Sequence, residues 1–420
     1  MSCLDIAVVT ETFPPEVNGV AMTLGRLVHG MRERGHRVSI VRPRQRRDDR
    51  GSEYDLTIAG VPMPGYAGLR FGLPSGGALA RQWRRHRPDL VHVVTEGPLG
   101  WSAVSTARRL GIPVTSGFHT NFDHYSVHYG LGWLRPAVSA YLRALHRRTR
   151  ATLVPTTALA ADLAGEGVPG VRVVGRGVDT RLFNPRRRST DLRAEWGAAP
   201  EDFVCLYVGR LAPEKNLVLA ERAFAAIRGQ HSNARMIWIG DGPSASRLKL
   251  ERPDHHFAGV RLHEALAEHY ASADLFLFPS LTETYGNVVA EAMASGTPVV
   301  AYRSAAAAEL VEDGENGALA PPGDDAGFVA AALSTLADRT RLGRLSRAAR
   351  VSMLPAQLGW CRPRVRAGRA GRDSRRLSLL GKTPRLRRCT LLGRSLTAPA
   401  SSRGCGRSSA APLDVLALPA

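Results

Sequence analysis

The chain has 420 residues, a formal net charge of +20, 44% hydrophobic residues and 22% charged residues. This length predicts two domains of roughly 150 to 200 residues and a tail, and the ordinary composition excludes a disordered or fibrous protein. The apolar stretch at residues 4–9 is too short for a signal peptide, and no run of roughly 18 apolar residues could span a bilayer. We therefore expect a cytoplasmic protein.

Short apolar segments alternate with amphipathic helical patterns along residues 1–180. Helices are expected at 20–31, 99–110 and 138–150, and strands at 6–9, 38–41, 90–94, 113–118, 152–155 and 171–174. This alternation is typical of βαβ units and predicts a first domain, residues 1–180, built on a parallel sheet.

The alternation restarts after the Arg-rich stretch 185–189. Strands are expected at 203–208, 236–239, 275–278 and 299–301, with helices around 218–227 and through Glu291 and a further apolar segment at 266–272. Residues 181–350 therefore form a second domain of the same class. The predicted fold is α/β, with two doubly wound, Rossmann-like domains whose sheets present their carboxyl ends to a central cleft.

The stretch 279–298 carries the most chemical information. Glu283 and Glu291 lie eight residues apart across a predicted strand-to-helix turn. If the helix begins near Gly286 and Asn287, its first backbone amides offer a site for a diphosphate. Glu291, about one turn further on, could accept hydrogen bonds from the vicinal hydroxyls of a ribose. A single glutamate is more often a solvated charge, but this spacing favours a site.

This element resembles the signature of the retaining glycosyltransferases with the GT-B fold, glycosyltransferase family 4 or group 1. The resemblance implies that the second domain binds a nucleotide-sugar donor and the first an acceptor. It also implies that Glu283 contacts the donor sugar, that the backbone at Asn287 and Val288 holds the diphosphate, and that Glu291 binds the ribose.

A second motif, at 208–216, places Arg210 and Lys215 between a predicted strand and a helix. An arginine and a lysine are usually surface residues, but at this position they can converge on phosphate oxygens. The motif resembles the family's G-R-x3-E-K element, so we expect both cations to stabilise the leaving nucleoside diphosphate. The chain has no Asp-x-Asp sequence, and its five cysteines lack metal-ligand spacing. We expect no metal ion and no cofactor, since the nucleotide sugar is a substrate.

Two loops of the first domain complete the predicted site. Gly19, in the loop at 12–20, permits close approach of a ligand to the backbone. His119 follows a predicted strand end and resembles the family histidine that contacts the donor sugar; a purely structural role is the alternative. The segment 175–185 resembles the family's interdomain linker.

The runs at 95–100, 118–125 and 283–287 most resemble bacterial GDP-mannose-dependent α-mannosyltransferases that act on glycolipids. This implies GDP-mannose as donor, a lipid or glycolipid as acceptor, and a location at the inner face of the cell membrane. It further implies front-face transfer, in which an oxygen of the departing diphosphate deprotonates the acceptor while Glu283 and His119 orient the sugar.

Charge is distributed unevenly along the chain. Residues 1–180 contain 23 Lys and Arg against 14 Asp and Glu, residues 181–350 contain 20 against 21, and residues 351–420 contain 14 against 2. The first excess predicts attraction to an anionic membrane surface, although a merely solvated face explains it equally well.

Two other functions fit parts of the pattern. A nucleotide-sugar epimerase of the same fold would share the diphosphate site, although the spacing of the glutamates favours transfer. A basic nucleic-acid-binding protein fits only the charge, because no reader motif is present, so we expect no specific nucleic-acid partner.

The periodicity stops near residue 351, and 351–420 forms an atypical Arg-rich tail to which we assign no fold. It reads like GC-rich coding sequence translated out of frame, which predicts a frameshift where the family usually has a helix that crosses back to the first domain. A genuine basic tail that binds membrane or nucleic acid is the alternative.

Overall fold

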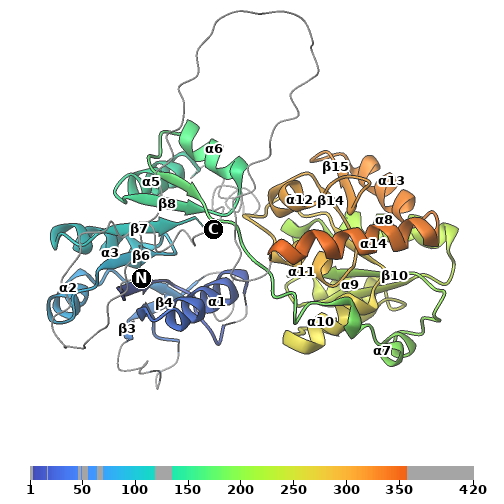
Figure 1. Ribbon diagram of the computed structural model, residues 1–420, viewed down its shortest axis with the longest axis horizontal. Coiled ribbons are helices and arrows are strands. Elements are labelled where there is room, and N and C mark those ends of the chain that lie inside the picture. The colour runs from blue at the N-terminus through green and yellow to red at the C-terminus, as the bar shows by residue number, and fades with distance from the viewer. Residues whose placement is uncertain are drawn as a thin grey trace, which may run out of the picture. The chain divides into compact units, whose positions relative to one another are not determined.

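The computed structural model describes residues 3–16, 18–45, 49, 55–63, 70–118 and 135–356. These residues build two separate parallel sheets, each with helices on both faces (Figure 1). The predicted α/β class and doubly wound architecture are therefore confirmed. None of the described helices is long and apolar enough to cross a membrane.

The first sheet has seven parallel strands and draws on the N-terminal part of the chain. In spatial order they are β3 (Leu56–Ile58), β2 (Arg37–Pro43), β1 (Asp5–Val9), β6 (Leu90–Val93), β7 (Val114–Gly117), β8 (Ala151–Val154) and β9 (Val171–Val173). A small antiparallel pair, β4 (Gly60–Pro62) and β5 (Arg70–Gly72), is separate from it.

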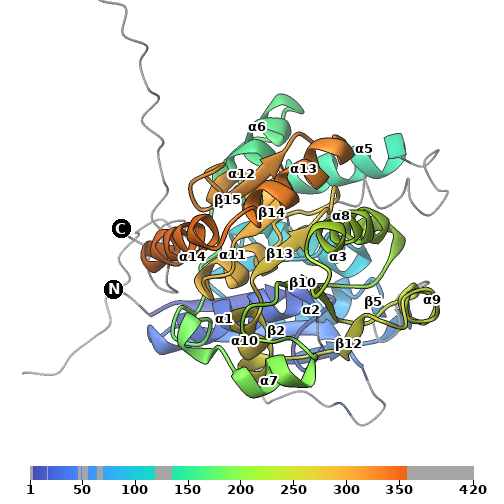
Figure 2. The ribbon, with the colours of Figure 1, turned by 90° about the vertical axis from the view of Figure 1, so that its right-hand side faces the viewer.

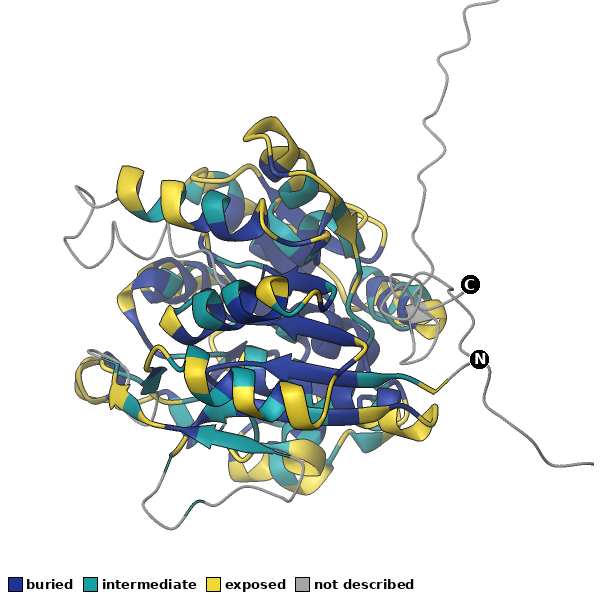
Figure 3. Cartoon of the chain, turned by 90° about the vertical axis from the view of Figure 1, so that its left-hand side faces the viewer, coloured by how far each residue is buried: buried dark blue, intermediate teal, exposed yellow. Residues whose placement is uncertain are grey.

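Helices cover both faces of this sheet because its central strands are apolar on both sides. One face packs against α2 (Gly76–Arg85), α3 (Pro98–Arg109), α5 (Arg135–His146) and α6 (Thr157–Gly165), and the other against α1 (Gly19–Glu33). Figure 3 shows the resulting burial: the central strands are dark blue, and exposed positions lie mainly on helices and loops.

The second sheet has six parallel strands. In spatial order they are β12 (His256–Gly259), β11 (Arg235–Ile239), β10 (Val204–Val208), β13 (Leu275–Phe278), β14 (Val299–Tyr302) and β15 (Gly317–Ala320). A short 3-10 helix, η2 (Pro185–Arg187), and α7 (Thr190–Glu195) precede it.

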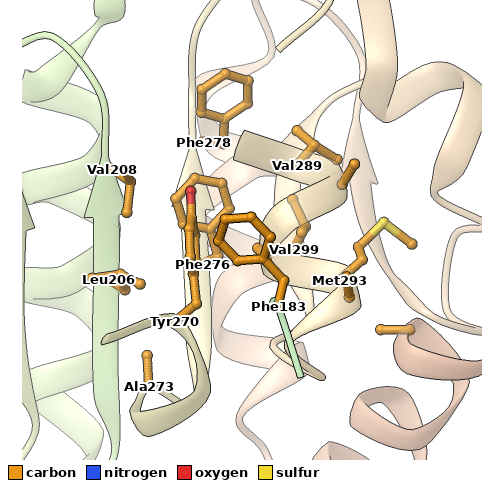
Figure 4. Packing of buried hydrophobic residues seen from close by; sticks show 14 of the residues in the cluster. Phe183, Leu206, Val208, Tyr270, Ala273, Phe276, Phe278, Val289, Met293 and Val299 are labelled. Carbon is orange, nitrogen blue, oxygen red and sulfur yellow. The ribbon is translucent and has the colours of Figure 1, made fainter. Parts of the chain in front are cut away.

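Helices cover both faces of the second sheet (Figure 2), and a hydrophobic cluster lies between the sheet and the helices on each face. One face carries α8 (Leu217–Gln230), α9 (Ala245–Glu251) and α13 (Asp325–Thr335), and the other carries α10 (His263–Ser272), α11 (Asn287–Ala294), α12 (Ala305–Leu310) and α14 (Arg339–Met353). Figure 4 shows the second of these faces, where the ring centroids of Tyr270 and Phe276 lie 5.7 Å apart and those of Phe276 and Phe278 lie 5.6 Å apart.

The strand order reverses direction between β1 and β6 in the first sheet and between β10 and β13 in the second. In open α/β sheets, ligands bind beyond the carboxyl ends of the strands at such switch points. The loops after β1, β6, β10 and β13 are therefore the first places to examine for a site.

Most predicted elements are present with small shifts at their ends. The helix predicted at 138–150 already ends at His146, because residues 147–150 turn into β8. The periodicity is expected to stop near residue 351, a few residues before the observed end of helical structure. Helix α14 continues to Met353, and a 3-10 turn, η4, follows at Leu354–Ala356. The domain boundaries at 180 and 350 stay predictions, and residues 357–420 lie outside the described part of the chain.

Candidate functional site

The second switch point brings together two residues from separate sequence motifs. Lys215 ends the 3-10 helix η3 (Pro213–Lys215) after β10, and Glu283 lies in the loop after β13. The Lys215 Nζ atom is 2.5 Å from Glu283 Oε1, and the Ser280 hydroxyl donates to the same oxygen at 3.0 Å. Both side chains are largely buried, with 12% and 17% of their surface exposed. The structure therefore joins two predicted site residues in one ion pair.

The charge state of Glu283 follows from these neighbours. Burial by itself raises the pKa of a carboxyl group, but here the charge and hydrogen bond of Lys215, with the Ser280 hydroxyl and the charge of Arg176, outweigh burial and lower the pKa of Glu283. Glu283 is therefore ionised at neutral pH and can orient a hydroxyl-bearing ligand as an acceptor.

Arg210 lies in the same loop as Lys215 and contacts a different carboxylate, that of Glu214. Its Nη1 atom is 3.2 Å from Oε1 of the buried Glu214, and its carbonyl accepts a hydrogen bond from the Tyr207 hydroxyl at 3.2 Å. Thr282, from the loop after β13, also donates weakly to the Glu214 carbonyl at 3.4 Å. These contacts tie the two loops of the switch point to each other.

Helix α11 begins at Asn287, as predicted. Gly286 precedes it with φ of 88°, a left-handed conformation that L-residues with a side chain rarely adopt, and a Cβ atom there would lie 3.3 Å from the Phe278 ring. In the first turn, the backbone amides of Asn287 and Val288 have no carbonyl four residues back within the helix. They can therefore bind an anion at the positive end of the helix dipole.

Glu291 lies one turn further along α11 and is 8% exposed. Tyr270 donates to its Oε2 atom at 3.5 Å, and Nη2 of Arg26, from α1, lies 3.8 Å from Oε1. Burial raises the pKa of Glu291, and the neighbouring Arg26 and Tyr270 only partly offset this effect. Glu291, the residue predicted to bind the ribose, therefore lies between the helices α1, α10 and α11.

Arg176 was not predicted as a site residue, yet it contacts the start of α11. Its Nη1 atom donates to Asn287 Oδ1 at 3.3 Å, and its guanidinium lies 5.2 Å from the centre of the Tyr285 ring. Asn287 also donates to the Thr23 hydroxyl of α1 at 3.0 Å. Sequence reasoning missed these contacts because Arg176 and Asn287 are 111 positions apart; the only signal was an arginine inside the linker motif.

The first switch point carries Gly19 and a buried acidic pair. Gly19 opens α1, directly after the N-cap Asn18, and the position of a Cβ atom on it is open space. The unpredicted residues Glu11 and Glu96 follow β1 and β6 and are 5% and 2% exposed. Burial and the charge of Glu96 raise the pKa of Glu11 to about 8, against a backbone hydrogen bond that lowers it.

His119 lies outside the described residues, so its predicted contact with the donor sugar stays a prediction. The same holds for the donor roles of the other predicted residues. Of these, the structure brings Lys215 and Glu283 into contact, ties the Arg210 loop to the loop after β13, and puts Asn287, Val288 and Glu291 on α11.

The chain matches two protein-family profiles. Residues 17–182 match Glycosyltransferase Family 4, and residues 202–338 match Glycosyl transferases group 1. The first match covers every strand of the first sheet except β1, and the second match covers all strands of the second sheet.

Curated relatives extend this similarity over most of the chain. A GDP-mannose-dependent alpha-mannosyltransferase of Mycobacterium tuberculosis is 34% identical over 325 residues, which cover 76% of this chain and 84% of the relative. An alpha-monoglucosyldiacylglycerol synthase of Streptococcus pneumoniae is 28% identical, covering 75% of this chain and 74% of the relative.

Solved structures show the same fold. A sucrose-phosphate synthase from Thermosynechococcus elongatus superimposes with a TM-score of 0.69 at 20% identity, covering 84% of this chain and 94% of that structure. At this identity the likeness concerns the fold alone, and it agrees with the GT-B architecture predicted from the sequence.

Proposed function

We propose that this chain, which belongs to the glycosyltransferases of family 4 and group 1, transfers mannose from GDP-mannose to a lipid or glycolipid. The observation that carries the proposal is the Lys215–Glu283 ion pair beside the first turn of α11. Relatives named GDP-mannose-dependent alpha-mannosyltransferase, at 31% to 34% identity, support this choice of donor.

In this proposal the donor diphosphate binds to the amides of Asn287 and Val288, and Glu291 accepts hydrogen bonds from the ribose. Lys215 and Arg210 stabilise the negative charge that grows on the departing diphosphate, which is the largest electrostatic need of the reaction. Glu283, which stays ionised beside Lys215, orients the sugar together with His119. An oxygen of the leaving diphosphate takes the proton of the acceptor hydroxyl, so transfer retains the anomeric configuration.

Since two cations, Lys215 and Arg210, and two backbone amides would bind the diphosphate in this proposal, we propose that the reaction needs no divalent cation. Transfer should proceed at an unchanged rate after exhaustive treatment with EDTA. Loss of activity on chelation, restored by Mg²⁺ or Mn²⁺, would contradict this part of the proposal.

A lipid acceptor accounts for the cationic excess of residues 1–180, because an anionic bilayer surface would attract that part of the chain. Peripheral binding at the inner face of the cell membrane would bring the protein to such an acceptor.

The decisive experiment is thermal unfolding with GDP, UDP, GDP-mannose and UDP-glucose in parallel. A ligand at about 100 times its dissociation constant stabilises the native state by roughly 2.7 kcal/mol. We expect stabilisation by the guanosine compounds only. In a second assay, we expect the protein to transfer mannose from labelled GDP-mannose into a lipid extract. Stabilisation by the uridine compounds instead would favour a glucosyl donor, and a cooperative transition with no shift would contradict a nucleotide-sugar site.

A further inference from the structure

We infer that Arg176 is a third cation of the donor site, which holds the first residue of α11 in place and binds the donor's diphosphate. This inference rests on the proposed function, because it assigns Arg176 to the same donor site. The residue lies in the segment between β9 and η2, outside the motif at 208–216 that predicted the other two cations.

Arg176 is attached to the loop before α11 at two points. Its side chain donates from Nη1 to Asn287 Oδ1 at 3.3 Å, and its backbone carbonyl accepts a hydrogen bond from the Tyr285 hydroxyl at 3.2 Å. The guanidinium also lies 5.2 Å from the centre of the Tyr285 ring, within the range of a cation–π contact. The linker segment and the loop that carries Glu283 are therefore held together at Arg176.

The Asn287 side chain extends this connection to α1. Its Nδ2 atom donates to the Thr23 hydroxyl at 3.0 Å, and that hydroxyl donates to the Gly19 carbonyl at 2.7 Å. Since both ends of the Asn287 amide are engaged, its orientation is fixed. Arg176 thus supports the residue whose backbone amide opens the anion-binding turn.

The charges around Arg176 favour an additional anion. Burial lowers the pKa of Arg176 to about 10, with Tyr285 and Glu283 acting in the opposite direction, so the side chain stays protonated at neutral pH. Glu283, the carboxylate coupled to it, is also the partner of Lys215 at 2.5 Å. Arg176 and Lys215 therefore both lie near Glu283 at the positive end of α11, where a bound diphosphate would meet two positive charges.

An arginine suits this position better than a lysine. Its planar guanidinium presents several N–H donors in fixed directions, so one can bind Asn287 while others face phosphate oxygens. A lysine would keep the charge but lose this geometry.

The test compares Arg176→Met, Arg176→Lys and the control Arg222→Met, which removes an exposed arginine of α8 that pairs with Asp325 at 3.0 Å. Calorimetric titration gives the dissociation constants of the nucleoside diphosphate that the wild type binds and of its monophosphate. We expect Arg176→Met to weaken diphosphate binding by about tenfold or more, since charge-assisted hydrogen bonds to one more phosphate group are lost, while monophosphate binding changes much less. Arg176→Lys should fall between, and Arg222→Met should match the wild type.

An unchanged ratio of diphosphate to monophosphate affinity in the folded Arg176 variants would overturn the inference and leave the proposed function intact. If Arg176→Met does not fold, the same ratio in Arg176→Lys decides, with kcat measured beside KM. A wild type that binds no nucleoside diphosphate would instead remove the proposed function, and this inference with it.

Discussion

The ion pair between Lys215 and Glu283 joins the motif at 208–216 to the stretch 279–298. In the absence of a ligand, the lysine neutralises a carboxylate that burial would otherwise protonate. A bound diphosphate would compete with Glu283 for the same ammonium group. Lys215 could then turn from Glu283 to the leaving group by a side-chain movement alone. In the proposed function, the pair would therefore serve both the stability of the site and its chemistry.

Replacing Lys215 with Met should lower kcat by about 10²- to 10³-fold, the usual cost of removing one preorganised group that stabilises developing charge. The substitution also leaves Glu283 without its closest cation, so the pKa of Glu283 should rise and the activity profile should acquire a dependence on its ionisation. Steady-state kinetics across pH 5 to 8 measure both effects.

Lys249→Met is the matched control, because this lysine lies on α9 against the Phe257 ring, with 5.8 Å between its Nζ atom and the ring centre. Near-normal turnover in Lys215→Met, with the control also normal, would contradict the role of Lys215.

The buried carboxyl group of Glu11 makes a prediction about pH and stability. Its pKa is raised from 4.5 to about 8 in the folded chain, so the folded state binds the proton more tightly than the unfolded state. The stabilisation is complete below about pH 4.5 and is lost as the pH rises toward about 8. Glu11→Gln, which cannot ionise, should therefore unfold less readily than the wild type at pH 8 and show a flatter dependence between pH 5 and 8.

Denaturant unfolding at pH 5, 6.5 and 8 measures this difference. Glu96 faces Glu11, and burial raises the pKa of Glu96 as well, so Glu96 contributes to the remaining slope. The exposed Glu33, which pairs with His29 on α1, provides the control Glu33→Gln. Equal slopes in the wild type and Glu11→Gln would show that Glu11 ionises normally.

At the scale of elements, the start of α11 depends on one glycine. Gly286→Ala would place a side chain in a left-handed conformation and set its Cβ atom against the Phe278 ring. We expect a loss of about 1 to 2 kcal/mol in the free energy of unfolding. Nucleotide binding should weaken further, because a shifted first turn misdirects the amides of Asn287 and Val288.

Gly343→Ala is the control, since Gly343 lies inside α14 and the nearest atom to an added Cβ would be at an ordinary 3.6 Å. That substitution should stabilise the chain by roughly 0.5 to 1 kcal/mol. Chemical denaturation and nucleotide titration of both variants separate the fold from the site. An unchanged nucleotide affinity in Gly286→Ala would exclude the first turn of α11 as the diphosphate site.

The elements that sequence reasoning found are those with strong local patterns. The apolar strands β1, β10 and β13 and the amphipathic helix α1 follow from periodicity and from β-branched or aromatic residues in the strands. By contrast, β15 reads Gly-Ala-Leu-Ala, which has low strand propensity, and α2 begins with two glycines. Both form because tertiary packing buries them, as Leu79 and Trp83 of α2 show.

The same distinction applies to the candidate site. Gly286 and the spacing of the two glutamates are local signals, and they predicted the start of α11 correctly. The contact of Arg176 with Asn287 and the proximity of Glu11 to Glu96 join residues that are far apart in the sequence and meet only in the folded chain. A single sequence contains no periodic signal for such pairs.

At the scale of the whole molecule, the segments with an excess of positive charge are not the same as the segments that form the fold and the predicted site. Residues 1–180 and 351–420 both carry an excess of Lys and Arg, but only the first segment contributes a described sheet and predicted site residues. All the hydrophobic clusters of the described part of the chain lie between residues 6 and 353, with their last member on α14. The fold and the nucleotide site should therefore not need residues 357–420.

A variant that ends at Ala356 should keep the unfolding temperature of the full chain and its stabilisation by GDP. It should also still sediment with vesicles containing anionic lipid, because the excess of 23 Lys and Arg over 14 Asp and Glu in residues 1–180 remains. Binding should fall steeply as salt is raised, since the attraction is between exposed charges and a charged surface. Vesicles of neutral lipid give the baseline. If truncation abolishes vesicle binding but not GDP binding, the membrane attraction belongs to the basic tail, and a frameshift that merely replaced a helix would no longer explain that segment.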